Sequence, residues 1–205
     1  GMTAYIGLKT IGEVKAGETV FVSAASGAVG GVASQIATIM GCRVVGSAGA
    51  DHKTAWLLGE AGIDKAINYK TCGDLESALT EACPDGIDVY FDNVGGAHLE
   101  AALNHMNPDG RIVVCGMISV YNDIVPTAGP ANLFRLITQR IRMEGFLVSD
   151  HYDQYPEYQE QMVEWIAEEK IVWHESVLEG IEKAPRALIC LFTGDNFGKM
   201  LVKLD

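Results

Sequence analysis

The stretch that decides the fold is Thr19–Met40, which reads TVFVSAASGAVGGVASQIATIM. Thr19 to Ala24 is a short, β-branched and apolar run, typical of a strand buried on both faces. A glycine-rich turn follows, and apolar residues then recur at helical spacing, at Val29, Val32, Ala33, Ile36, Ala37 and Met40. Strand, glycine turn and helix together predict a dinucleotide-binding unit, because the helix N-terminus offers unpaired N–H groups and positive partial charge to a pyrophosphate.

The glycines of this turn have separate expected roles. Gly27 lets the backbone approach a pyrophosphate, and Gly30 lets the helix pack closely on the strand. Ala25 stands where the G-x-G-x-x-G pattern has its first glycine. The motif alone is therefore also compatible with a plain strand-to-helix turn that binds no ligand.

Composition limits the class of protein. The chain has 205 residues, 48% of them hydrophobic, enough for one large α/β domain or one domain with appendages. Its net charge of −12 disfavours nucleic acid and anionic membranes as partners. The sequence has no apolar run that could span a bilayer and no signal-peptide pattern. Five scattered cysteines without a C-x-x-C pair indicate reduced thiols in a cytoplasmic protein, and the histidine spacing predicts no metal site.

Strand and helix patterns alternate along the chain. We expect strands at 19–24, 42–47, 65–68, 87–92, 111–115 and 142–148, and helices after the glycine turn and at 53–61, 74–82, 131–140 and 156–169. Another helix, between the fourth and fifth strands, is expected to carry Leu99, Ala102, Leu103 and Met106 on one side. This order predicts an α/β fold with a doubly wound, six-stranded parallel sheet. Asp51 is expected to cap a helix, and Pro108-Asp109-Gly110 to form a turn. The tail then predicts a strand at 174–178, a helix at 185–192 and a strand at 199–204.

In such a sheet a ligand binds beyond the carboxyl ends of the strands. Those ends are predicted at 25–31, 93–96, 115–121 and 146–150, all rich in glycine or polar residues. Ordinary loops share this composition, so these four segments indicate a ligand site only because they occur together with the glycine turn.

The end of the second strand indicates which cofactor binds. It has no acidic residue to take a ribose hydroxyl pair, and Asp51 comes later than such an acid usually does. Lys53 is placed to reach a phosphate, which favours NADP, although an ordinary surface lysine is the alternative. Tyr121, just past the fifth strand, is the one plausible proton donor there; its alternative is a loop tyrosine that packs on the cofactor.

Other chemistries of this fold class fit less well. The only Y-x-x-x-K spacing that a short-chain dehydrogenase would need is Tyr5–Lys9, which lies upstream of the glycine turn. The sequence has no G-x-S-x-G nucleophile elbow and no P-loop lysine.

Several motifs, in order and spacing, resemble one family across nearly the whole chain. They are AASGAVGG (24–31), GCRVVGSAGADHK (41–53), INYKT (67–71), YFDNVGG (90–96), GRIVVCGMISVYN (110–122) and GDNFGKMLV (194–202). The chain resembles the zinc-independent medium-chain dehydrogenase/reductases, in the branch of the prostaglandin, alkenal and curcumin reductases. Alanine at position 25 is usual in that family.

This resemblance implies NADPH-dependent reduction of an activated carbon–carbon double bond in α,β-unsaturated aldehydes and ketones. Hydride would pass to the β-carbon, and the enolate would be protonated at the α-carbon. Tyr121 is the nearest match to a residue beside substrate and cofactor, but the resemblance leaves its acid role open, because the ribose hydroxyl of the cofactor can relay a proton. The resemblance also implies a homodimer. The residues it implies for the cofactor are Ala28, Val29, Gly30, Gly31, Lys53, Tyr69, Asn93, Cys115, Gly116, Met117, Ile118, Ser119, Tyr121, Phe146, Leu147, Val148 and Asn196.

The resemblance also implies a domain division. Residues 1–172 would be the NADP-binding Rossmann domain, and 173–205 a tail that packs on a GroES-like catalytic domain absent from this chain. We therefore expect an excised cofactor-binding part that binds NADPH but is poorly active. Its tail would expose Val177, Leu178, Leu188, Phe192 and Leu201. The alternatives are a non-catalytic NADPH-binding module that senses or scaffolds, and a quinone reductase.

Overall fold

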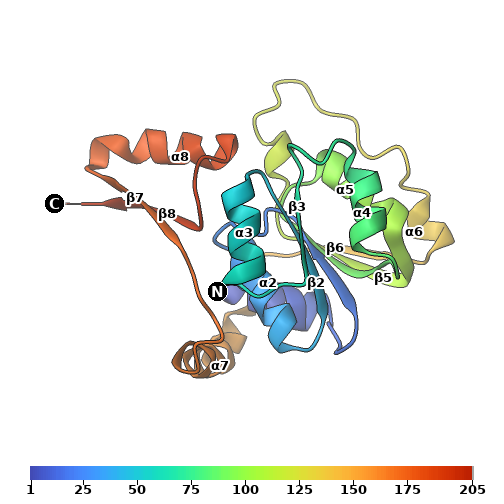
Figure 1. The fold of residues 1–205 in the computed structure, drawn as a ribbon, viewed down its shortest axis with the longest axis horizontal. Coiled ribbons are helices and arrows are strands. Elements are labelled where there is room, and N and C mark those ends of the chain that lie inside the picture. The colour runs from blue at the N-terminus through green and yellow to red at the C-terminus, as the bar shows by residue number, and fades with distance from the viewer. Residues whose placement is uncertain (205) are drawn as a thin grey trace.

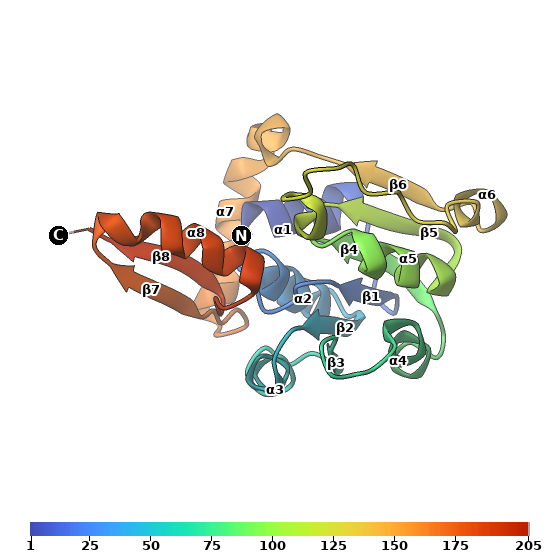
Figure 2. The ribbon, with the colours of Figure 1, turned by 90° about the horizontal axis from the view of Figure 1, so that it is seen from above.

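The computed structural model describes residues 1–204. Figure 1 shows the fold. Its main sheet has six parallel strands in the order β3-β2-β1-β4-β5-β6, the doubly wound order predicted from the sequence, and Figure 2 labels all six. The strands are β1 Thr19–Val22, β2 Arg43–Ala48, β3 Lys65–Asn68, β4 Ile87–Asp92, β5 Met106–Val114 and β6 Arg142–Gly145.

Helices cover both faces of this sheet, because successive strand side chains point to opposite sides. Val20 and Val22 of β1 enter one core, and Phe21 between them enters the other. The first core is covered by α1 Met2–Ile6, α2 Gly30–Ile39, α3 Asp51–Gly59 and α7 Tyr155–Ala167. The second is covered by α4 Leu75–Ala82, α5 Gly96–His105 and the short α6 Arg135–Thr138.

The tail forms a separate small unit that projects from one side of the main body (Figures 1 and 2). Two parallel strands, β7 Glu175–Glu179 and β8 Lys199–Lys203, are joined by α8 Ala184–Thr193. Three of the apolar residues expected at its surface are 39–56% exposed, namely Val177, Leu188 and Phe192. The other two, Leu178 and Leu201, are half-buried.

Two predicted elements are shorter in the structure. The helix expected at 131–140 is helical only in α6, because the Asn132 amide is bonded to α5 through the Glu100 carbonyl (2.8 Å) and Asn104 Oδ1 (2.9 Å). The strand expected at 142–148 ends at Gly145, where the chain leaves its only neighbour, β5, and enters the 3₁₀ turns of Val148–Gln154.

Two local predictions were wrong in detail. Asp51 is the first residue of α3 rather than its cap, and its carboxylate accepts a hydrogen bond from Asn68 Nδ2 at 2.6 Å. The turn expected at 108–110 lies inside β5 as an irregularity opposite Ile87 and Val89. Asp109 takes a left-handed φ of +62° at this irregularity.

The Tyr5–Lys9 pair contributes to packing at the start of the chain. A one-turn π-helix, Gly7–Ile11, continues α1 and brings Lys9 Nζ to 2.7 Å from the Tyr5 hydroxyl. Glu157 of α7 accepts from both residues, and Tyr5 is almost completely buried. The pair therefore ties α1 to α7. Among the helices of residues 1–204, none is long and apolar enough to cross a membrane.

Candidate functional site

The glycine turn follows β1 at the carboxyl edge of the sheet. Ala24 takes a left-handed φ of +48°, a strained conformation of the kind that collects at functional sites. A Cβ on Gly30 would lie 2.3 Å from the Ala24 carbonyl oxygen, so only glycine fits there, as expected. Within the described chain no acceptor pairs with the N–H groups of Ala28 and Val29, next to the start of α2. The turn therefore presents free donors at a helix N-terminus, where an anion binds favourably.

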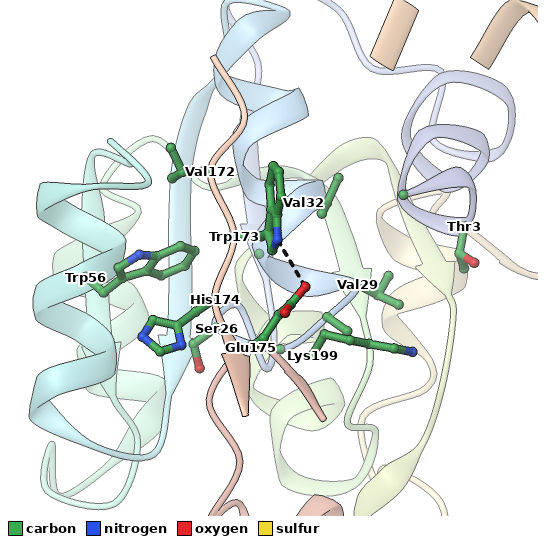
Figure 3. Close-up of a pocket in the computed structure, with 15 residues that line it drawn as sticks. Thr3, Ser26, Val29, Val32, Trp56, Val172, Trp173, His174, Glu175 and Lys199 are labelled. Atoms are coloured by element: carbon green, nitrogen blue, oxygen red, sulfur yellow. Dashed lines mark hydrogen bonds between the residues drawn. The ribbon is translucent and has the colours of Figure 1, made fainter. Parts of the chain in front are cut away.

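The tail crosses this turn. Gly198 N–H donates to the Ser26 carbonyl at 3.0 Å, and Gly27 and Gly198 form a parallel bridge. A cavity of about 350 Å³ lies between turn and tail, lined by Gly27 to Val29 on one side and Trp173 to Glu175 on the other (Figure 3). Figure 3 shows Trp173 beside Val32, with its indole N–H donating to Glu175 at 3.3 Å.

The carboxyl ends of β2 and β3 hold a second group of polar side chains. Lys53 in the first turn of α3 is 6% exposed, and its ammonium donates to the carbonyls of Gly194 and Asn196, both at 2.6 Å. Burial, and then the charge of Lys70, lowers the pKa of Lys53. The Tyr69 hydroxyl lies over Gly49, 2.8 Å from where a Cβ would be. The structure thus bonds Lys53 to Gly194 and Asn196 of the tail, and it places Tyr69 over Gly49, directly after β2.

A buried carboxylate organises the loop after β4. Asp92 is fully buried, and its Oδ1 accepts from the Ser23 and Tyr90 hydroxyls (3.2 and 2.7 Å) and from the N–H groups of Val94 and Gly95 (2.9 and 2.8 Å). Ser23 in turn accepts from the Asn93 N–H at 2.9 Å, and its carbonyl accepts from the Asn93 side-chain amide at 2.7 Å. This network fixes Asn93 and leaves its side-chain oxygen for a ligand.

An open groove of about 510 Å³ lies at the ends of β5 and β6. The predicted residues that line it are Cys115, Gly116, Met117, Tyr121, Phe146 and Leu147. Tyr121 is 60% exposed, and its hydroxyl oxygen accepts from the Met117 N–H at 3.0 Å. The hydroxyl proton is therefore free to be donated into the groove. Burial, and then the nearby Asp92 carboxylate, raises the pKa of the Cys115 thiol to about 11.

Three of the residues predicted to contact the cofactor do not line this groove. Ile118 and Ser119 bond the loop after β4, with Ser119 Oγ donating to the Val94 carbonyl at 2.6 Å. Val148 packs against the first core. The predicted set missed the residues by which the tail lines the first cavity, among them Trp173, His174 and Lys199. Nothing in their local sequence marks them, because only the return of the tail to the glycine turn brings them there.

The fold and the glycine turn define a Rossmann-type α/β protein. Residues 28–168 match the family model described as zinc-binding dehydrogenase, and the chain belongs to this family. It is 54% identical, over all 205 residues, to the NADP(+)-dependent 2-alkenal reductase of Nicotiana tabacum, and 47% identical to prostaglandin reductase 1 of Bos taurus over 99% of the chain.

The fold of the chain is also that of a solved structure. CurA from Vibrio vulnificus, solved in complex with NADPH, superposes on the whole chain with a TM-score of 0.95 at 40% identity. The chain spans only 60% of the tobacco protein, and 62% of the bovine protein and of CurA. The family description names zinc, but among residues 1–204 no group of three or more His, Cys, Asp and Glu side chains could hold a metal ion. These residues therefore do not fit a zinc site.

Proposed function

We propose that this chain is the NADPH-binding part of an ene-reductase that reduces activated carbon–carbon double bonds in α,β-unsaturated aldehydes and ketones. The observation that carries the proposal is the arrangement along one sheet edge. The glycine turn, with its free N–H donors, lies in the middle of this edge. Lys53 lies on one side of it, near the ends of β2 and β3, and the open groove with Tyr121 lies on the other side, at β5 and β6. The alkenal and prostaglandin reductases among the relatives support the same reaction class.

The residues present fit an extended dinucleotide. The N–H groups of Ala28 and Val29 would take the pyrophosphate. Lys53 and Tyr69 lie at an edge without an acid at the tip of β2, which suits a 2′-phosphate. Asn93 would hold the nicotinamide ribose through its free amide oxygen. When bound, NADPH supplies the hydride for the reduction.

Tyr121 is the proposed proton donor of the groove. Its oxygen already accepts a hydrogen bond from the Met117 backbone, so its own proton is directed elsewhere. Donation to the α-carbon would complete the reduction after hydride reaches the β-carbon. The Cys115 thiol, with its raised pKa, stays protonated and adds no negative charge to this groove.

We also propose how the chain is organised. Residues 1–172 would bind the cofactor, and residues 173–205 would pack on a further, GroES-like domain, as the exposed apolar side chains of α8 suggest. A dye that fluoresces on apolar surface should then bind this chain more strongly than an intact relative. Equal dye signals would count against this organisation.

A homodimer is the proposed assembly. β6 is an edge strand paired only with β5, and Ile137 and Met143 beside this edge are 81% and 40% exposed. Light scattering should give twice the chain mass, and a monomer at micromolar concentration would contradict it.

We infer a cytoplasmic location because all five cysteines are free thiols.

The reaction is tested with the protein that contains this chain. Oxidation of NADPH is followed with a 2-alkenal, an enone and a quinone as acceptors. Faster turnover of the alkenal or enone supports the proposal, whereas preference for the quinone would favour a quinone reductase. NADPH binding without turnover of any acceptor would favour a sensing module. Tyr121→Phe should lower kcat by a larger factor than it raises the Kd for NADPH. An unaltered kcat would remove Tyr121 as the donor.

A further inference from the structure

Lys53 has limited capacity for a phosphate. An ammonium has three N–H donors. Two of those on Lys53 are already committed to the carbonyls of Gly194 and Asn196, and the side chain is nearly buried. At most one donor remains for a ligand. A phosphate monoester carries about −1.5 to −2 charges at neutral pH, more than one partly committed ammonium offsets.

Lys70 supplies a second positive charge at the same place. It lies two residues beyond the end of β3, where its N–H donates to Asn68 Oδ1 at 3.1 Å. Its side chain returns over the end of β2, so that Cε lies 3.1 Å from the position of a Cβ on Gly49. The Tyr69 hydroxyl lies 2.8 Å from that same position. Gly49 therefore leaves the space in which Tyr69 and Lys70 meet.

The ammonium of Lys70 has no carboxylate partner among residues 1–204. The acids nearby are engaged elsewhere. Asp51 accepts from Asn68, and Asp195 accepts from Thr193 Oγ1 at 2.8 Å and from Arg186 at 3.5 Å. A chain with a net charge of −12 thus keeps one uncompensated cation at the tip of β2.

We propose that Lys70 is a specificity-determining residue of the cofactor site, which takes the 2′-phosphate between its ammonium, the Tyr69 hydroxyl and the remaining donor of Lys53. This inference rests on the proposed function, because it presumes that the dinucleotide lies along this edge. It adds a second cation that the sequence motif does not single out. Lys70 acts on the 2′-phosphate alone and has no part in hydride transfer.

The test compares Lys70→Gln with Lys65→Gln. Lys65 is an exposed lysine at the start of β3, whereas Lys70 lies just past its end, so the two variants lose the same charge from opposite ends of this strand. Calorimetry gives the Kd of the 205-residue chain for 2′,5′-ADP and for 5′-AMP, which differ by the 2′-phosphate. We expect Lys70→Gln to weaken 2′,5′-ADP about tenfold, with a shallower salt dependence, and to leave 5′-AMP unchanged. Lys65→Gln should change neither Kd by more than about twofold.

Two further variants keep the proposal falsifiable. Lys70→Arg should preserve the preference for 2′,5′-ADP, and Gly49→Ala should reduce it, because a Cβ there would displace Tyr69 and Lys70. An unchanged preference in Lys70→Gln, or the same loss in Lys65→Gln, would overturn the role of Lys70 alone. Equal affinity of the unmodified chain for the two nucleotides would instead overturn the NADPH assignment on which it rests.

Discussion

The ammonium of Lys53 is bonded to the backbone carbonyl of Asn196 over 2.6 Å, across 143 positions of sequence. A second bond of the same length joins Lys53 to Gly194. Lys53 and Asn196 were both expected to contact a cofactor, and the structure shows that they also contact each other. The helix after β2 and the tail are therefore held together at the edge where the ligand is proposed to bind.

Lys53→Ala should loosen the tail. The loss of two charge-assisted hydrogen bonds from a nearly buried ammonium is expected to lower the free energy of unfolding by about 2 kcal/mol. Amide exchange, measured by mass spectrometry, should become faster in the peptide that covers 194–198. Lys65→Ala, at an exposed lysine, is the control and should change neither quantity. Unchanged protection at 194–198 in Lys53→Ala would show that these bonds do not hold the tail.

Asp92→Ala should be among the most destabilising single substitutions. It removes an acceptor shared by four donors and leaves these donors without a partner in the core. We expect a loss of about 3 kcal/mol or more in urea unfolding. Glu81→Ala, which removes an exposed carboxylate from α4, should stay within about 0.5 kcal/mol. Similar unfolding midpoints for the two variants would contradict the role assigned to Asp92.

Two glycine substitutions should have opposite signs. Gly30→Ala places a Cβ 2.3 Å from a carbonyl oxygen and should cost about 2 kcal/mol, since the neighbouring atoms are backbone. Gly59→Ala, at the exposed end of α3 where a Cβ meets nothing within 4 Å, should stabilise the chain by up to about 1 kcal/mol. Thermal unfolding measures both. A Gly30→Ala variant as stable as Gly59→Ala would mean that the turn can rearrange.

The fold could be predicted because the pattern is local. Strands β1, β2 and β4 are short, largely apolar runs, and β3 and β4 lie at the predicted residues. The errors occur where distant groups override local preference. Asp51 has the chemistry of a cap, but Asn68 binds its carboxylate. Asn132 lies in a helical pattern, but its amide is held by α5.

The thiol of Cys115 should react slowly. Its pKa of about 11 leaves roughly one thiol in several thousand ionised at pH 7.5, far fewer than in an unperturbed cysteine. Because a raised thiol pKa delays ionisation as pH rises, the rate of alkylation by iodoacetamide should still be increasing at pH 10. Mass spectrometry of the Cys115 peptide measures this rate, with the urea-unfolded chain as reference. A plateau near pH 9 in the folded protein would contradict the shift.

The site was predictable only in part. Motif positions near the strand ends, such as Cys115 and Tyr121, do line a groove. The commitment of Lys53 to the tail could not be predicted, since it depends on how residues 194–198 return to the glycine turn. Lys70 lies within the motif at 67–71 but was not among the residues predicted for the cofactor, because only the space over Gly49 places it at the end of β2.

The central claim is that this chain binds NADPH along the carboxyl edge of its sheet and recognises the 2′-phosphate there. Calorimetric titration of the unmodified 205-residue chain with NADPH and with NADH tests it most directly. We predict binding of NADPH at least about tenfold tighter than that of NADH, a difference of about 1.4 kcal/mol. Equal affinities, or no binding of either nucleotide, would contradict the claim.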